Sequence, residues 1–202
     1  MKRKPELAYN SLMRTYRTVN LNVLWFLVAL SVLIFIVTLL SPDAVINLLG
    51  LTPALLLKQP WTIITSMFVH GSLWHVLLNM ISLFFLGSFL IRAAGERSFL
   101  AVFFLGGVAG NILFILLAHP YSTGIGASGA IFALGGALAV IVPRVPVLIL
   151  FIPVPVPLWV AIIVFFLFSF LPNIAWQAHL GGLLLGLIAG LILRRRRRIY
   201  SF

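Results

Sequence analysis

Cysteine is absent from the sequence, and acidic residues are nearly absent: the 202 residues include no Cys and only three Asp or Glu. Without thiols, the chain forms neither disulfides nor a cysteine nucleophile. A zinc protease needs carboxylate or clustered histidine ligands, typically in a His-Glu-x-x-His pattern, and that pattern does not occur. His70 and His75 are five residues apart and would face different sides of a helix. We therefore expect no metal and no cofactor.

Long polar stretches are also missing. Hydrophobic residues make up 62% of the chain and charged residues 8%, against roughly half and a quarter in soluble domains. Apolar runs of about twenty residues, the length that spans a bilayer, recur along the sequence. This composition predicts an all-α integral membrane protein whose environment is the lipid bilayer, with no soluble domain.

The net charge of +11 does not indicate nucleic acid, because the basic residues gather at the chain ends. Five lie between Lys2 and Arg17, and Arg194 to Arg198 form a run. Such clusters flank membrane spans, set topology and meet anionic headgroups. The first apolar segment follows a long basic lead and has no small-residue cleavage site after it, so we interpret it as a retained anchor.

Six spans are expected, with two longer segments and two short breaks between them. The predicted spans are residues 21–40, 73–91, 99–118, 128–142, 158–171 and 178–193. Residues 43–71 mix prolines with apolar residues, which favours short helices lying partly in the outer leaflet. Residues 143–157 hold five prolines, which excludes a spanning helix and favours extended or hairpin structure. The breaks after the second and fifth spans are placed at residues 92–97 and 172–177.

Orientation follows from the positive-inside rule. With six spans and the N-terminus inside, every Lys and Arg except Lys58 lies on the cytoplasmic side. A seventh span would move the five-arginine tail outside. We expect a multi-pass protein of the cell membrane with both termini cytoplasmic, divided into a basic lead (1–18), a six-span domain (19–193) and a basic tail (194–202).

Polar residues meet at one face of this arrangement. Spans two, four and six start at the same side, and their first turns carry His75 and Asn79, Ser128, and His179. Such side chains inside a bilayer are costly and indicate function. At 1.5 Å per residue, Ser128 lies roughly 10 Å below the outer surface, which implies an aqueous cavity open to the outside.

Small residues recur every four positions in spans four and six, at 129, 133 and 137 and at 178, 182, 186 and 190. This spacing lets two helices pack closely in a membrane. Ordinary packing is the plainer interpretation of such a stripe, but here Ser128 and His179 adjoin matching ends. Close packing would bring the serine hydroxyl to the imidazole, as general-base activation requires.

No carboxylate is expected near this pair, so the catalytic group reduces to a Ser128–His179 dyad. His75 and Asn79 lie one turn apart on one helix face. Both can direct donors at a single oxygen. Together with the backbone N–H of Ser128 they would form an oxyanion hole for acyl transfer.

These motifs resemble the rhomboid family of intramembrane serine proteases. The matching residues are Gly126-Ala127-Ser128-Gly129, the series His70, His75 and Asn79, and Ala178-His179 followed by glycines. The resemblance covers residues 21–193 and implies a six-helix bundle with a partly embedded first outer loop. It implies that Ser128 is the nucleophile, His179 the base and Gly126 the shaper of the turn. His70 would hydrogen-bond within the first outer loop, and Glu96 would tie spans two and three.

Two positions depart from the family pattern. Trp61-Thr62 stands where Trp-Arg is frequent, so a polar tie in the first outer loop is expected to be missing. Phe132 stands where a Tyr often stacks on the histidine. Phe132 retains the ring without the hydroxyl, and we expect altered but not abolished activity.

The resemblance implies that single-span or multi-span membrane proteins are the substrates, cleaved within an unwound transmembrane helix. Span five is our candidate for the lateral gate, although its phenylalanines could equally face lipid. An inactive rhomboid-like binding or escort protein is the main alternative. A transporter is disfavoured because no acidic residue recurs within the spans. Neither the individual substrate nor the oligomeric state follows from the sequence.

Overall fold

The computed structural model describes residues 20–148 and 154–199, with side chains described up to residue 195. The basic lead and the centre of the proline-rich stretch lie outside the described residues. Six apolar helices form where the six spans are predicted: α2 (Asn22–Leu40), α5 (Leu73–Ala94), α6 (Glu96–Leu117), α7 (Ser128–Ile141), α8 (Leu158–Phe168) and α9 (Trp176–Ile199). The prediction of an all-α membrane protein is confirmed. Helices suit these sequences because lipid offers no hydrogen-bond partner to an open backbone.

Four of these helices are long and apolar enough to cross a membrane, namely α2, α5, α6 and residues 176–195 of α9. The other two, α7 and α8, are apolar but have only 14 and 11 residues. At 1.5 Å per residue, α7 extends about 21 Å, less than the hydrocarbon thickness of about 30 Å. The count of six complete spans therefore stays a prediction.

Three predicted boundaries are wrong. The break at 92–97 is a single residue, Gly95, whose φ of +87° lets α5 end and α6 begin one residue later. The fifth helix ends at Phe168, three residues earlier than expected. The last helix runs through the arginine run to Ile199, because arginine is a good helix former and nothing there breaks a helix.

Short helices fill residues 43–71, the segment here called the first outer loop, as predicted: α3 (Pro42–Leu49), η1 (Pro53–Leu55), α4 (Thr62–Thr65) and η2 (Ser66–Phe68). The loop has polar ties despite the missing arginine. Trp61 donates its indole N–H to the Leu48 carbonyl at 2.8 Å, and Thr62 donates its hydroxyl to the Gln59 carbonyl at 2.7 Å. An isolated bridge pairs Leu51 with Gly124, so the loop is also joined to the segment before α7.

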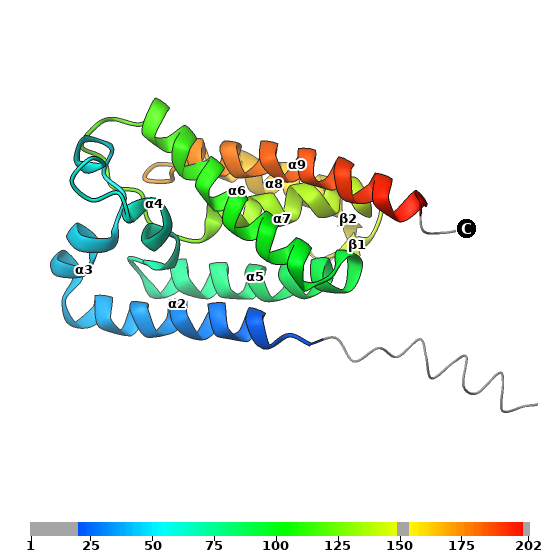
Figure 1. Ribbon diagram of the computed structural model, residues 1–202, viewed down its shortest axis with the longest axis horizontal. Coiled ribbons are helices and arrows are strands. Elements are labelled where there is room, and N and C mark those ends of the chain that lie inside the picture. The colour runs from blue at the N-terminus through cyan, green and yellow to red at the C-terminus, as the bar shows by residue number, and fades with distance from the viewer. Residues whose placement is uncertain (1–19, 149–153, 200–202) are drawn as a thin grey trace, which may run out of the picture.

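The proline-rich stretch forms a hairpin in its described part, as predicted. Strands β1 (Pro146–Val147) and β2 (Val156–Pro157) pair antiparallel, with Pro146 opposite Pro157. This hairpin lies at the same end of the bundle as the C-terminal end of α9, and the short helices of the first outer loop lie at the opposite end (Figure 1). The hairpin and the first outer loop thus cover opposite ends of the bundle.

Helices α7 and α9 pack backbone to backbone. A side-chain carbon at Gly182 would collide with the Gly129 carbonyl oxygen, and one at Gly186 with the Ala133 carbonyl oxygen. At Gly190 an added carbon would lie 2.7 Å from the Ala137 carbonyl oxygen. The close approach predicted from the small-residue stripes is therefore present, and α6 packs on both helices through its own glycines at 106, 107 and 110.

Candidate active site

Ser128 is the first residue of α7, and the turn before it is shaped by Gly126. Gly126 has φ +114°, a conformation that disfavours any side chain. A carbon added there would also lie 2.6 Å from Nε2 of His75. The Gly126 N–H donates to the Ser66 carbonyl at 2.8 Å, which fixes the turn to the first outer loop. Only glycine meets both conditions.

The structure brings Ser128 and His179 together. Oγ of Ser128 lies 2.7 Å from Nε2 of His179, across the α7–α9 contact. His179 is buried, whereas Ser128 is half-buried. If Nε2 is unprotonated, this geometry lets the hydroxyl donate to the imidazole, as a serine nucleophile and its base require.

A third hydroxyl joins this pair, and our sequence analysis missed it. Oγ of Ser169, at the C-terminal end of α8, lies 2.7 Å from Nδ1 of His179. Both ring nitrogens therefore have a serine partner. Ser169 is a polar residue inside a predicted span, and applying the cost of buried polar groups to every span would have drawn attention to it.

Aromatic rings cover the imidazole. Phe132 stacks on His179 with ring centroids 4.5 Å apart and an interplanar angle of 29°. Phe166 of α8 meets Phe132 edge-on at 6.1 Å. The missing tyrosine hydroxyl thus leaves the stacking geometry in place.

The candidate donors for an oxyanion, predicted from the sequence, lie on two helices, α7 and α5. As the first residue of α7, Ser128 has a backbone N–H without an intrahelical acceptor, and the positive end of the helix dipole lies there. His75 faces the Gly126 turn. Asn79 is buried, and its Nδ2 donates to the His75 carbonyl at 2.8 Å, while its Oδ1 has no partner among the described residues. The structure thus places Asn79 beside His75, with one amide hydrogen already used.

His70 is also brought to the site, contrary to our expectation from spacing. It precedes α5 instead of belonging to it, and so its ring packs edge-on against that of His75 with centroids 5.0 Å apart. His70 is fully buried and hydrogen-bonds through Nδ1 with the Phe68 carbonyl, within the first outer loop. Burial, with a smaller contribution from His75, lowers the pKa of His70 to about 4.

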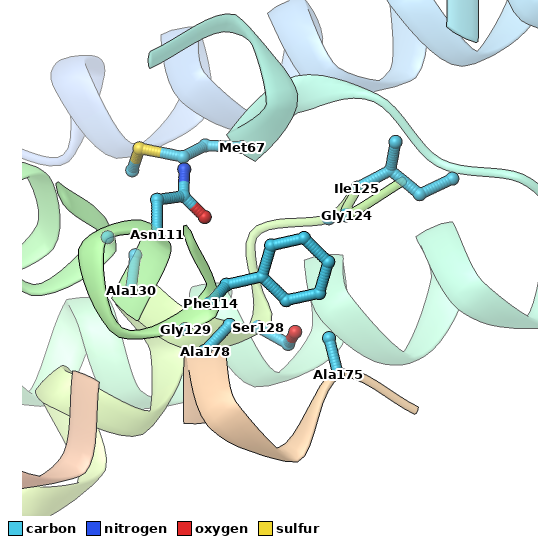
Figure 2. A pocket seen from close by; sticks show the side chains of 12 residues that line it. Met67, Asn111, Phe114, Gly124, Ile125, Ser128, Gly129, Ala130, Ala175 and Ala178 are labelled. Atoms are coloured by element: carbon cyan, nitrogen blue, oxygen red, sulfur yellow. The ribbon is translucent and has the colours of Figure 1, made fainter. Parts of the chain in front are cut away.

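A small cavity lies behind the serine, between α6, α7 and α9 (Figure 2). Its volume of about 10 Å³ is close to the least that holds one water molecule. The Phe114 ring lines one side, and Ala175, just before α9, and Ala178, in its first turn, line another (Figure 2).

Asn111 lines this cavity and supports the site indirectly. Its Nδ2 donates to the Ile63 carbonyl at 2.7 Å and to the Ser66 hydroxyl at 3.0 Å. The Ser66 carbonyl in turn holds the Gly126 turn. Our sequence analysis did not single out Asn111, although it is an amide in the middle of a predicted span.

One expected contact is not seen. Glu96 forms no ion pair within the part of the chain that the structure describes, so the expected tie between spans two and three is not seen. His119 is exposed and bonds only within its own turn. Among the described residues no three His, Asp or Glu side chains gather in a way that could hold a metal ion.

The amino-acid sequence matches one family of known proteins. The Rhomboid domain model matches residues 57–196. The chain is 30% identical over 148 residues to Rhomboid protein 1, mitochondrial, of Saccharomyces cerevisiae, covering 64% of this chain and 40% of the relative. It is 30% identical over 125 residues to Rhomboid-like protease 3 of Toxoplasma gondii, covering 58% of this chain and 47% of the relative. It is also 31% identical over 78 residues to Inactive RHOMBOID-like protein 8 of Arabidopsis thaliana, covering 39% of this chain and 22% of the relative. The chain spans less than half the length of these relatives.

Proposed function

Because the chain belongs to the rhomboid family, we propose that it is an intramembrane serine endopeptidase that cleaves transmembrane segments of other membrane proteins. The observation that carries the proposal is the 2.7 Å approach of Ser128 Oγ to His179 Nε2 at the N-terminus of α7. The relative named Rhomboid-like protease 3 supports the same activity.

In the proposed reaction Ser128 attacks the scissile carbonyl while its proton moves to Nε2 of His179. The carbonyl oxygen becomes an anion and accepts hydrogen bonds from the Ser128 N–H, His75 and Asn79. His179 then gives its proton to the leaving amine, and an acyl-enzyme remains on Ser128. Water activated by His179 hydrolyses this ester and restores both side chains.

The substrate helix must unwind, because the carbonyls of an intact helix are hydrogen-bonded and covered by side chains. We propose that it approaches from the lipid beside α8. The side chains of Phe165 and Phe168 on this helix, and of Phe170 just after it, are exposed on the surface of the bundle. Residues that break helices near the cleavage point would then be favoured. Water would reach Ser128 from the outer face.

The alternative is an inactive rhomboid-like protein that binds membrane clients. A relative named as inactive matches part of the chain, so family membership does not by itself establish proteolysis. The paired Ser128 and His179 favour the enzyme, because a binding protein has no need of this hydrogen bond.

The test is proteolysis by purified protein in liposomes with a fluorescent single-span substrate. Wild type should cleave it, and Ser128→Ala and His179→Ala should each lower turnover by about a thousandfold or more. Ser122→Ala and His119→Ala are matched controls, since both residues lie in the turn just before α7 and neither contacts the dyad. Both controls should cleave like wild type. Cleavage that survives Ser128→Ala would refute the serine mechanism, and binding without cleavage by wild type would favour the alternative.

We also propose a membrane orientation with both termini cytoplasmic and the active site toward the outer face of the cell membrane. The ends of α5 and α9 that carry Arg92 and Arg194 support it, since these basic ends would both be cytoplasmic. Protease added outside intact cells should leave a tag at either terminus uncut. Digestion of either tag would refute the orientation.

A further inference from the structure

Ser169 is a buried hydroxyl that the proposed reaction does not use. It follows the last residue of α8, is 1% exposed, and lies 2.7 Å from Nδ1 of His179. Ser128 holds the other ring nitrogen at the same distance. The imidazole is therefore bound at both nitrogens by hydroxyls from two different parts of the chain.

We propose that Ser169 is a positioning residue for the base: it accepts the Nδ1–H of His179 and so leaves Nε2 free to take the proton of Ser128. The inference rests on the proposed protease function of this site. In the chemical step the Ser128 proton moves to Nε2 while its oxygen bonds to the scissile carbon. Ser169 accepts from Nδ1 before, during and after the transfer and exchanges no proton.

The charged ring decides the direction of this hydrogen bond. A neutral imidazole has one donor and one acceptor nitrogen, and a hydroxyl can bond to either. Once Nε2 has taken the proton, both nitrogens are donors, and Ser169 Oγ must accept. Hydrogen bonds to a charged group are stronger than neutral ones. The bond to Ser169 therefore stabilises the imidazolium that forms with the tetrahedral intermediate more than it stabilises the resting enzyme.

This position does the orienting work of a carboxylate without its charge. The described residues place no Asp or Glu near the ring, and a hydroxyl supplies only part of the stabilisation that an anion would. Loss of one hydrogen bond to a charged group corresponds to about a tenfold to hundredfold fall in rate. In the proposed reaction Ser169 contacts the base and not the scissile bond, so we expect the effect in kcat.

The placement of Ser169 links the base to α8. Phe166 of the same helix supports Phe132, which stacks on His179. Two contacts that hold the imidazole thus depend on the C-terminal part of α8. The Nδ1 bond therefore depends on the position of the C-terminal part of α8.

The kinetic test compares Ser169→Ala with Ser31→Ala in liposomes. Ser31 is a matched control: it is 1% exposed, and its hydroxyl donates to the Leu27 carbonyl in α2. Ser169→Ala should lower kcat about tenfold to a hundredfold with KM within twofold, whereas Ser31→Ala should leave both unchanged. Ser169→Thr keeps the hydroxyl and should recover most of kcat. Equal kcat in the two alanine variants would overturn the proposal, as would equal loss in Ser169→Ala and Ser169→Thr at wild-type melting temperatures.

A second measurement needs no substrate and separates this inference from the proposed function. The ¹⁵N shifts of the His179 ring report which nitrogen carries the proton, and His179→Ala assigns them. Wild type in detergent should show the proton on Nδ1, and Ser169→Ala should shift the ring toward a mixture of tautomers. Unchanged shifts would overturn the positioning role. If the wild type cleaves no substrate but its ring shifts change in Ser169→Ala, the proposed protease function is refuted. The hydrogen bond between Ser169 and Nδ1 of His179 would still be supported.

Discussion

Gly182→Ala should disable the site without touching any reacting group. Gly182 packs against the carbonyl group of Gly129. Gly129 follows Ser128 directly in the sequence, and Gly182 lies three residues after His179 on α9. A methyl group there collides with that carbonyl oxygen, so α7 and α9 must separate by about 1 Å at this level. The 2.7 Å distance between Ser128 and His179 would then exceed the limit of a hydrogen bond.

The loss of general-base catalysis corresponds to a fall in kcat of about 100-fold or more. Overpacking should also cost about 1–3 kcal/mol of stability. Gly190→Ala is the matched control, because its added carbon would lie 2.7 Å from the Ala137 carbonyl oxygen but about three turns away from His179.

The assay measures kcat in liposomes and melting temperature in detergent for both variants. We expect melting temperature to fall in both variants, and further in Gly182→Ala because its added carbon overlaps the facing carbonyl oxygen more; kcat of Gly190→Ala should stay within about threefold of wild type. If Gly182→Ala keeps the same kcat as Gly190→Ala, the dyad does not depend on the close α7–α9 contact, and the reasoning is refuted.

Three further predictions concern the surroundings of the dyad. Gly126→Ala should lower kcat at least tenfold, because the residue has φ +114° and its methyl group would meet His75; wild-type kcat would contradict it. Asn111→Ala should lower stability by about 1–3 kcal/mol by leaving the Ser66 and Ile63 partners unbonded, and an unchanged melting temperature would count against this tie. The third concerns pH: His70 has a pKa of about 4 in the folded protein against 6.5 as its ordinary value, so the unfolded chain binds the extra proton between these values. Melting temperature should therefore fall as pH drops from 6.5 to 4, and less steeply in His70→Asn; identical slopes would exclude His70 as a source.

The sequence predicted the helices well because a bilayer allows few alternatives. Apolar runs had to become helices, and five prolines excluded a seventh span. Helix ends were harder: Gly95 alone separates α5 from α6, and the arginine run continues α9. Whether a charged run stays helical depends on helix propensity and not on hydropathy, so hydropathy placed that end too early.

Within the site, the prediction reached the residues that motifs make visible. It missed Ser169 and Asn111, because a single polar residue in an apolar span does not indicate which residue it will hydrogen-bond with. Their partners lie in other helices or in the first outer loop. It also separated His70 from His75 by treating both as helical, whereas the chain before α5 is not helical and folds back onto that helix. These contacts arise from tertiary packing, which local spacing does not encode.

The most direct test of the central claim is to identify the residue that carries a covalent adduct after reaction with a fluorophosphonate, a reagent for activated serines. The preparation should be one that cleaves a transmembrane substrate, and the adduct should be located by peptide mass spectrometry. We predict a single adduct on Ser128, lost in His179→Ala and retained in Ser122→Ala. An adduct on another serine, or labelling of Ser128 that is unchanged in His179→Ala, would contradict the Ser128–His179 dyad.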